Sequence, residues 1–166
     1  MKAKLKTGEI IELANLGKVN MAKESTLSDF IKFASEKYDA DKYTLVLWDH
    51  GGGIPIGFGK DENFDNAGMT EAQIGMALKE ADVEFETIVM DACYMCTLEV
   101  AMAVKDHAKY MVAAESYTVG TGLDYSGWLN YMGENPEAVG FEYGEILVTE
   151  YMDSVTGSRN LASMST

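Results

Sequence analysis

The stretch TIVMDACYMC, residues 87–96, holds both cysteines of the chain. It begins as a run of β-branched and apolar residues, passes through Asp91, and continues into a C-x-x-C pair, Cys93 and Cys96. A short apolar run that ends in polar residues is typical of a buried strand whose carboxyl end carries function. Three roles are open for the cysteines: a redox pair, half of a metal site, or one nucleophile beside a packing residue.

Two further apolar runs of strand length lie on either side of this stretch. The first is YTLVLW at 43–48, a continuous apolar run as expected for a strand covered on both faces. The second is YMVAAES at 110–116, which is expected to be a third buried strand. Helical patterns lie between the runs, and one of them opens with capping-box spacing at Thr70 and Gln73. This alternation predicts an α/β fold with a mostly parallel sheet and helices on both of its faces.

Local signals predict two elements before the first of these strands. Residues 8–17 indicate a short strand that fades into a loop. Residues 25–38 carry apolar side chains at helical spacing, and Ser25 or Thr26 is expected to cap that helix.

Local signals also predict the loops and helices between residue 51 and residue 154. A glycine-rich and then acidic loop is expected from 51 to 69, and a helix from 97 to 106. After a second glycine-rich loop, Pro136 suits a first helical position, which predicts a last helix from there to about Ser154.

Composition limits the classes of function. With 166 residues, of which 47% are hydrophobic, the chain is expected to form one domain over residues 1–166. The formal net charge is −14 and Arg159 is the only arginine, which argues against nucleic acid as a partner. No apolar run approaches the roughly 18 residues that a membrane span needs, and the N-terminus lacks the pattern of a signal peptide.

The redox and zinc interpretations of the cysteines fit poorly. Thioredoxin-like sites also place C-x-x-C between a strand and a helix, but here Tyr94 and Met95 intervene and no tryptophan precedes the pair. Structural zinc needs four Cys or His ligands. The chain has two of each, and His107 is expected at the far end of the helix that follows Cys93.

The nucleophile interpretation uses most of the available residues. A thiolate at Cys93, between a strand and a helix, would be favoured by the helix N-terminal dipole. His50 follows the strand that ends at Trp48, so it is expected at the same rim as an acid–base partner for acyl transfer. Gly51 and Gly52 would offer unobstructed backbone N–H groups to an oxyanion. Each piece alone also fits a packing cysteine or a glycine turn.

A phosphate-binding loop is excluded by residue identity. A P-loop anchored on Gly59 and Lys60 would need glycine and Ser or Thr where Ile54 and Asp61 stand. A G-x-G-x-x-G pattern from Gly51 also fails, because position 56 is isoleucine.

His-Gly after one buried strand and Asp-Ala-Cys after the next resemble the signature of caspase-like (clan CD) cysteine peptidases. The sequences of the two blocks, DKYTLVLWDHGGG and IVMDACYMCTLEVA, are similar to those of the clostripain family, and the similarity covers nearly the whole chain. The resemblance implies a caspase-like α/β/α sandwich. It also implies a catalytic dyad of His50 and Cys93, with the backbone N–H groups of Gly51 and Cys93 as the oxyanion hole.

The resemblance also implies a specificity. Asp91 matches the acidic residue at the base of the family's S1 pocket, and the family cleaves peptide substrates after Arg or Lys, which suits a buried carboxylate. The alternative for Asp91 is a helix cap or a rim acid. The later segments AAES and GTGLDYSGWLNYM are similar too, and they assign Glu115, Ser116 and Trp128 to substrate binding. Cys96 is expected to pack.

Relatives mature by cleavage between the two catalytic blocks, which implies self-cleavage after Lys60 in the stretch GKDENFDNAG, expected to be exposed. The alternative for this stretch is a solvated acidic loop without a processing role. No metal or cofactor is required for the chemistry, although the family implies a possible calcium dependence. Asp61, Asn63 and Asp65 present oxygens on alternate residues, as a weak calcium site would, but they lack the glycine and the distant glutamate of an EF-hand.

Two wider expectations follow from the resemblance. Relatives carry further strands and helices, so this chain is expected to be the catalytic core of a longer protein that is secreted or attached to the cell envelope of a bacterium. The alternative from another class of function is a catalytically silent, truncated, peptidase-like binding or regulatory module.

Overall fold

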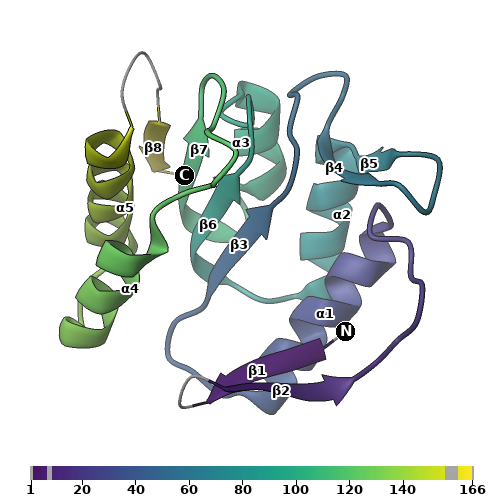
Figure 1. The fold of residues 1–166 in the computed structure, drawn as a ribbon, viewed down its shortest axis with the longest axis horizontal. Helices are drawn as coiled ribbons and strands as arrows, with labels where there is room; N and C mark the ends of the chain where they lie inside the picture. Colours follow the sequence, from purple (N-terminus) through teal and green to yellow (C-terminus); the bar gives the residue numbers. More distant parts are fainter. Residues whose placement is uncertain (1, 7–8, 156–160, 166) are drawn as a thin grey trace.

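The centre of the protein is a four-stranded sheet in the order β3-β6-β7-β8 (Figure 1). The computed structural model describes residues 2–6, 9–155 and 161–165. Strands β3 (Thr44–Trp48), β6 (Phe85–Asp91) and β7 (Ala108–Ala114) are parallel, and β8 (Leu161–Ser165) runs antiparallel to β7. The three predicted strands are therefore confirmed, and the fourth is one that local sequence signals did not reveal.

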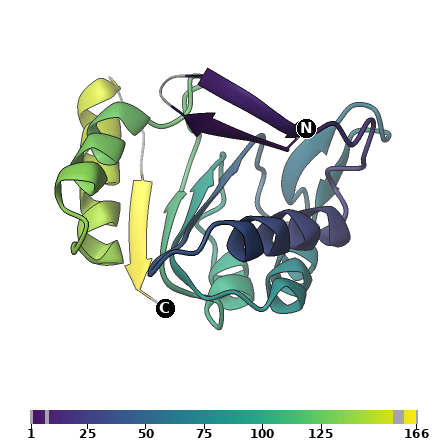
Figure 2. The same cartoon turned by 90° about the horizontal axis from the view of Figure 1, so that it is seen from below.

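Helices cover both faces of this sheet (Figure 2). Helices α1 (Glu24–Lys37), α2 (Glu71–Ala81) and α3 (Leu98–Val104) lie on one face, and α4 (Tyr125–Glu134) and α5 (Gly140–Ser154) lie on the other. The predicted α/β sandwich is confirmed. Among the described residues, no helix is both long and apolar enough to cross a membrane.

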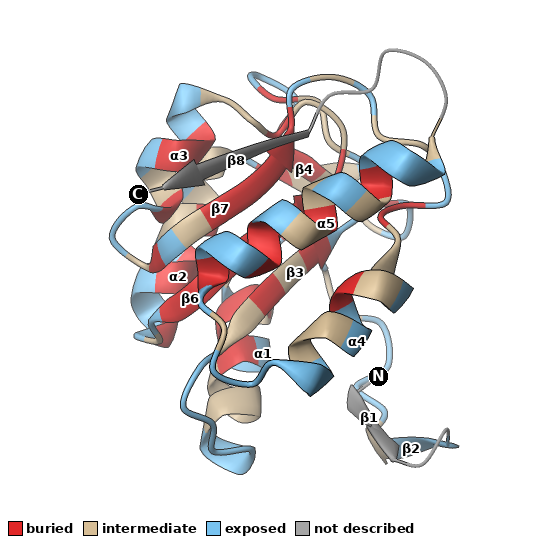
Figure 3. Ribbon diagram, turned by 90° about the vertical axis from the view of Figure 1, so that its left-hand side faces the viewer, coloured by how far each residue is buried: buried red, intermediate tan, exposed pale blue. Residues whose placement is uncertain are grey.

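Strands β3, β6 and β7 each carry an apolar run because each contributes side chains to two cores. All seven residues of β6 are buried; Ile88 and Met90 join the core under α1–α3, and Val89 joins the core under α4 and α5. Strand β7 repeats the alternation with Met111 on the first side and Val112 on the second. Figure 3 shows buried residues along the strands and on one side of α5, whose other side is exposed.

The start of α2 follows the predicted capping box. The Thr70 hydroxyl accepts from the Gln73 backbone N–H at 3.3 Å, and the Gln73 side chain accepts from the Thr70 N–H at 3.0 Å. The predicted cap of α1 is wrong. That helix begins at Glu24 with no side-chain cap, and Thr26 instead donates to the Asn20 carbonyl in the preceding loop.

Two small hairpins lie outside the main sheet. Strand β2 (Glu9–Ala14), which the sequence predicts, pairs with β1 (Lys2–Lys6). The segment expected to be a loop at 51–69 contains β4 (Phe58–Asp61) and β5 (Ala67–Met69). Its short strands are rich in glycine, which obscures the alternation of side chains that signals a strand.

The predicted helix start at Pro136 is wrong, because that residue lies between α4 and α5. Helix α5 begins at Gly140, whose N–H donates to the buried Glu86 carboxylate at 2.9 Å. A Cβ on Gly140 would come within 2.5 Å of the Tyr110 ring, so only glycine lets the helix start this close to the sheet. The predicted end of the helix at Ser154 is confirmed.

Glu86 is a buried carboxylate with its own charge partner. Burial alone would raise its pKa, but hydrogen bonds from Lys109 and Gly140 together with nearby positive charges hold the pKa below its usual value. Its ion pair with Lys109 measures 2.8 Å. Tertiary contacts at Glu86, and not the helix signal at Pro136, therefore decide where the last helix begins.

Candidate active site

One pocket of about 450 Å³ lies at the carboxyl ends of the three parallel strands. Its lining comes from three segments: Trp48, Asp49 and His50 after β3, Asp91, Ala92 and Cys93 at the end of β6, and Tyr117, Thr118, Val119, Gly120 and Gly122 after β7. The register pairs Trp48 with Asp91. His50 and Cys93 each lie two residues further on, so they enter the pocket at the same level.

Gly51 brings the first two segments into contact. A Cβ on this residue would overlap the carbonyl oxygen of Cys93 and lie 2.9 Å from Cβ of Ala92. The Gly52 N–H donates to the Gly57 carbonyl at 3.0 Å, and the Gly59 N–H donates to the His50 carbonyl at 2.7 Å. The Gly51 N–H takes part in neither bond. Of the two glycines predicted to serve an oxyanion, Gly52 has its N–H committed to the fold.

Cys93 is half-buried and contacts the loop after β7. Its Sγ accepts from the Thr118 N–H at 3.3 Å. The residue that follows it, Tyr94, has a positive φ of 58° and donates its N–H to the Ser116 carbonyl at 3.0 Å. The chain therefore turns sharply after the cysteine before it enters α3.

The predicted helix dipole at Cys93 is wrong. Helix α3 begins at Leu98 and is capped by the Thr97 hydroxyl, which accepts from the Val100 N–H at 3.3 Å. Cys93 lies four positions before this cap, and the dipole acts mainly within the first turn of a helix. The thiol thus makes its hydrogen bonds with the backbone of Thr118, and not with a helix end.

Asp91 is 2% exposed and has two unlike oxygens. Its Oδ2 accepts from the Leu123 N–H at 3.0 Å and from the Tyr125 hydroxyl at 2.7 Å. Its Oδ1 is buried and has no hydrogen-bond partner among the described residues. Because Thr97 caps the following helix, the alternative of Asp91 as the cap of that helix is wrong.

The Asp91 carboxylate also affects the pKa of Tyr125. Burial raises the pKa of Tyr125, and the hydrogen bond to Asp91 raises it further. The tyrosine therefore stays protonated and continues to donate to Asp91 through the alkaline range.

Three residues assigned to substrate binding do not line this pocket. Trp128 is 3% exposed and packs in the core under α4 and α5, where its ring lies 5.9 Å from that of Tyr125. Glu115 is exposed, and Ser116 is half-buried beside the turn at Tyr94. The tryptophan of the pocket is Trp48, which is 65% exposed.

Sequence reasoning missed Trp48, Leu123 and Tyr125. Trp48 had a usable signal, because it directly precedes the Asp-His-Gly block at the strand end. Leu123 acts through its backbone N–H and Tyr125 through a contact over 34 positions, so neither has a local signature.

Cys96 has a different environment from Cys93. It packs against the core under α1–α3, and its backbone N–H donates to the Ala114 carbonyl at 3.0 Å. Burial, and secondarily the charge of Glu115, raises the pKa of the Cys96 thiol. The predicted packing role of Cys96 is supported.

The predicted processing residue, Lys60, is an exposed residue of β4. The next residue, Asp61, is buried, and its carboxylate accepts from the N–H groups of Met21 and Asn63, each at 2.9 Å. Within the described part of the chain, no group of three or more His, Cys, Asp or Glu side chains could hold a metal ion. The carboxylate of Asp61 thus joins the β4–β5 hairpin to the segment before α1.

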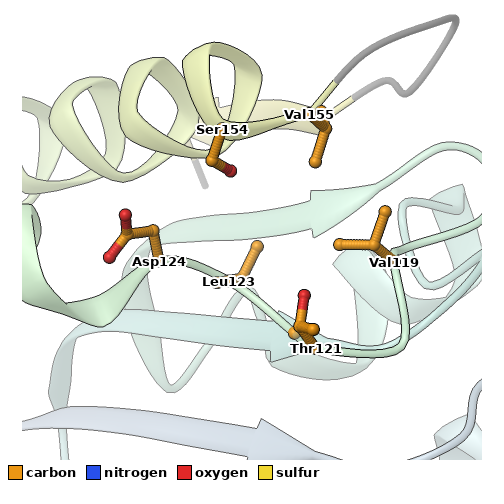
Figure 4. Close-up of a pocket in the computed structure, with 7 residues that line it drawn as sticks. Val119, Thr121, Leu123, Asp124, Ser154 and Val155 are labelled. Atoms are coloured by element: carbon orange, nitrogen blue, oxygen red, sulfur yellow. The ribbon is translucent and has the colours of Figure 1, made fainter.

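A second pocket of about 560 Å³ adjoins the first (Figure 4). Val119 and Gly122 line both pockets, and Ser154 and Val155 at the end of α5 close the second from the other side. Helix α5 also holds this loop directly, because the Val119 N–H donates to the Tyr151 hydroxyl at 3.2 Å. The loop at 119–124 is therefore a wall between α5 and the pocket that contains Cys93.

Comparison with known proteins supports the fold. Solved structures with the same fold include a secreted C11 cysteine protease from Bacteroides thetaiotaomicron in complex with an irreversible peptide inhibitor (TM-score 0.80, 20% identity, 98% of this chain and 51% of that chain). Another is an inactive zymogen C11 protease from Parabacteroides distasonis (TM-score 0.72, 24% identity, 98% and 46%).

A curated relative, clostripain of Hathewaya histolytica, is 29% identical over 124 residues, which are 64% of this chain and 23% of that protein. This chain thus spans 23% to 51% of the length of these relatives. The model of peptidase family C11, the clostripain family, matches residues 2–165. The chain belongs to the clostripain family of cysteine peptidases.

Proposed function

We propose that this chain is the catalytic core of a cysteine endopeptidase that cleaves peptide bonds after Arg or Lys. The observation that carries the proposal is a single pocket lined by Cys93, His50 and Asp91, which supply a thiol, an imidazole and a buried carboxylate. Export is proposed as well, because the relative from Bacteroides thetaiotaomicron is described as secreted.

In the proposed reaction, His50 accepts the proton of the Cys93 thiol as the sulfur attacks the carbonyl carbon of the scissile bond. The oxyanion of the tetrahedral intermediate accepts hydrogen bonds from the backbone N–H groups of Gly51 and Cys93. His50 then protonates the leaving amine as the C–N bond breaks. Water hydrolyses the thioester, with His50 as its base, and this restores the thiol.

The proposed nucleophile is tested by covalent labelling. We expect an acyloxymethyl ketone with Arg or Lys at P1 to alkylate Cys93, and mass spectrometry of the digested adduct identifies the labelled residue. Cys93→Ala should abolish labelling, whereas Cys96→Ala, which removes the packed thiol, should still be labelled at Cys93. Labelling at Cys96 alone would contradict the proposal. Labelling at Cys93 without turnover of any peptide would favour the silent binding module.

We also propose self-cleavage after Lys60, which is exposed and basic. The bond to Asp61 lies in the β4–β5 hairpin, so cleavage requires the hairpin to open locally. On incubation, wild type should yield a new N-terminus at Asp61, detected by N-terminal sequencing. Lys60→Arg should retain the cut and Lys60→Gln should lose it. The same fragment from Cys93→Ala protein would assign the cut to another protease.

Parallel samples with and without calcium test the proposed dependence on this ion.

A further inference from the structure

The two oxygens of the Asp91 carboxylate differ in their hydrogen bonds, and only Oδ1 has acceptor positions left for a ligand that reaches it. Oδ2 already accepts two hydrogen bonds, from the Leu123 N–H at 3.0 Å and from the Tyr125 hydroxyl at 2.7 Å. Oδ1 is buried without a partner among the described residues. A carboxylate oxygen has about two acceptor positions. Both positions on Oδ2 are therefore occupied, and those on Oδ1 are open.

Gly122 adds a steric limit on the same side. A Cβ at this position would lie 2.7 Å from Oδ2 of Asp91 and 2.9 Å from Nε1 of Trp48. The backbone of Gly122 thus passes close to Oδ2 and leaves it little room for a third partner. Its φ of +76° is one that glycine adopts without strain.

Lysine and arginine make different demands on such a carboxylate. An arginine guanidinium binds a carboxylate best as a fork, with one N–H to each of the two oxygens. A lysine ammonium acts as a compact point charge, and a single oxygen satisfies one of its donors. A carboxylate on which only Oδ1 can accept a further hydrogen bond can still bind a lysine ammonium. It can accept only one of the two hydrogen bonds of an arginine fork.

We infer that Tyr125 is a specificity-determining residue that biases this pocket toward lysine over arginine at P1. Its hydroxyl occupies the acceptor position on Oδ2 that an arginine fork would need. The inference rests on the proposed function, because it concerns the side chain that Asp91 binds. Burial and the bond to Asp91 raise the pKa of Tyr125, so the hydroxyl remains a donor at neutral and alkaline pH.

The test compares rates of Cys93 alkylation by three matched acyloxymethyl ketones that differ only in the P1 residue: Lys, Arg or norleucine. Labelling needs no turnover, and intact-mass spectrometry follows it directly. Tyr125→Phe keeps the ring that packs on Trp128 and removes only the hydroxyl. We expect wild type to react faster with the Lys reagent than with the Arg reagent. In Tyr125→Phe, the Arg-to-Lys ratio of rates should rise about tenfold, the value of one hydrogen bond to a charged group.

Tyr131→Phe is the matched control. Tyr131 lies on the same helix, its ring meets that of Tyr143 edge to face, and it does not line the pocket. Its loss of a hydroxyl should leave the ratio unchanged. If both basic reagents outpace norleucine but Tyr125→Phe leaves their ratio as in wild type, the inference is overturned and the proposed function stands. If neither basic reagent outpaces norleucine at Cys93, the proposed function fails and the inference fails with it.

Discussion

Replacing Gly51 by alanine is expected to slow the alkylation of Cys93 about hundredfold, because small displacements of reacting groups have effects of this size. The new methyl group would overlap the carbonyl oxygen of Cys93, which belongs to the backbone and cannot rotate away. The segments that carry His50 and Cys93 must then separate. The change also displaces the Gly51 N–H that we assign to the oxyanion. Labelling rates with a basic acyloxymethyl ketone measure the effect.

Gly133→Ala is the control for this substitution. Gly133 lies on α4, and a Cβ there would meet no atom within 4 Å. Alanine is the better helix former by roughly 1 kcal/mol, so this variant should be as stable as wild type or slightly more so. Its labelling rate should equal that of wild type. A Gly51→Ala protein that is folded by circular dichroism and labels at the wild-type rate would refute the close approach at Gly51.

Asp91→Asn is expected to reduce the reactivity of basic substrates and reagents by about ten- to a hundredfold, while neutral ones change little. The two neighbours of Oδ2, the Leu123 N–H and the Tyr125 hydroxyl, are both donors. The asparagine carbonyl oxygen should therefore take the place of Oδ2. The amide NH₂ then replaces Oδ1, and the open acceptor becomes a donor that a cationic side chain cannot use.

Rates for matched Lys, Arg and norleucine reagents measure this prediction. Asp82→Asn is the control, because it changes the net charge equally at the end of α2, where the φ of 55° suits asparagine. It should leave all three rates unchanged. Equal losses for basic and neutral reagents in Asp91→Asn would contradict a role in specificity and indicate a general disturbance of the pocket.

The sequence by itself determined the layered fold and the residues at the strand ends. Residues 45–48, 88–90 and 111–114 are apolar without interruption, and a strand with that pattern is expected to be covered on both faces. Parallel strands then bring their carboxyl ends to one edge, so the sequence predicts that His50 and Cys93 lie close together. The capping box at Thr70 could also be predicted from the sequence, because Thr70 and Gln73 lie three positions apart.

Only the tertiary structure decided which residues surround those two. Trp128 lies in the core under α4 and α5, and Trp48 lines the pocket. Both tryptophans belong to segments that resemble the family, so the sequence alone does not show which of them reaches the pocket. The last helix begins at Gly140 and not at the predicted Pro136, because the buried Glu86 carboxylate accepts a hydrogen bond from the Gly140 N–H at the helix N-terminus.

The same limit applies to Asp91, whose partners Leu123 and Tyr125 lie 32 and 34 positions away. Helix and strand patterns arise from neighbours within a few residues, so they can be read along the chain. The pocket arises from packing between distant segments, and no periodicity in the sequence records which of them will touch.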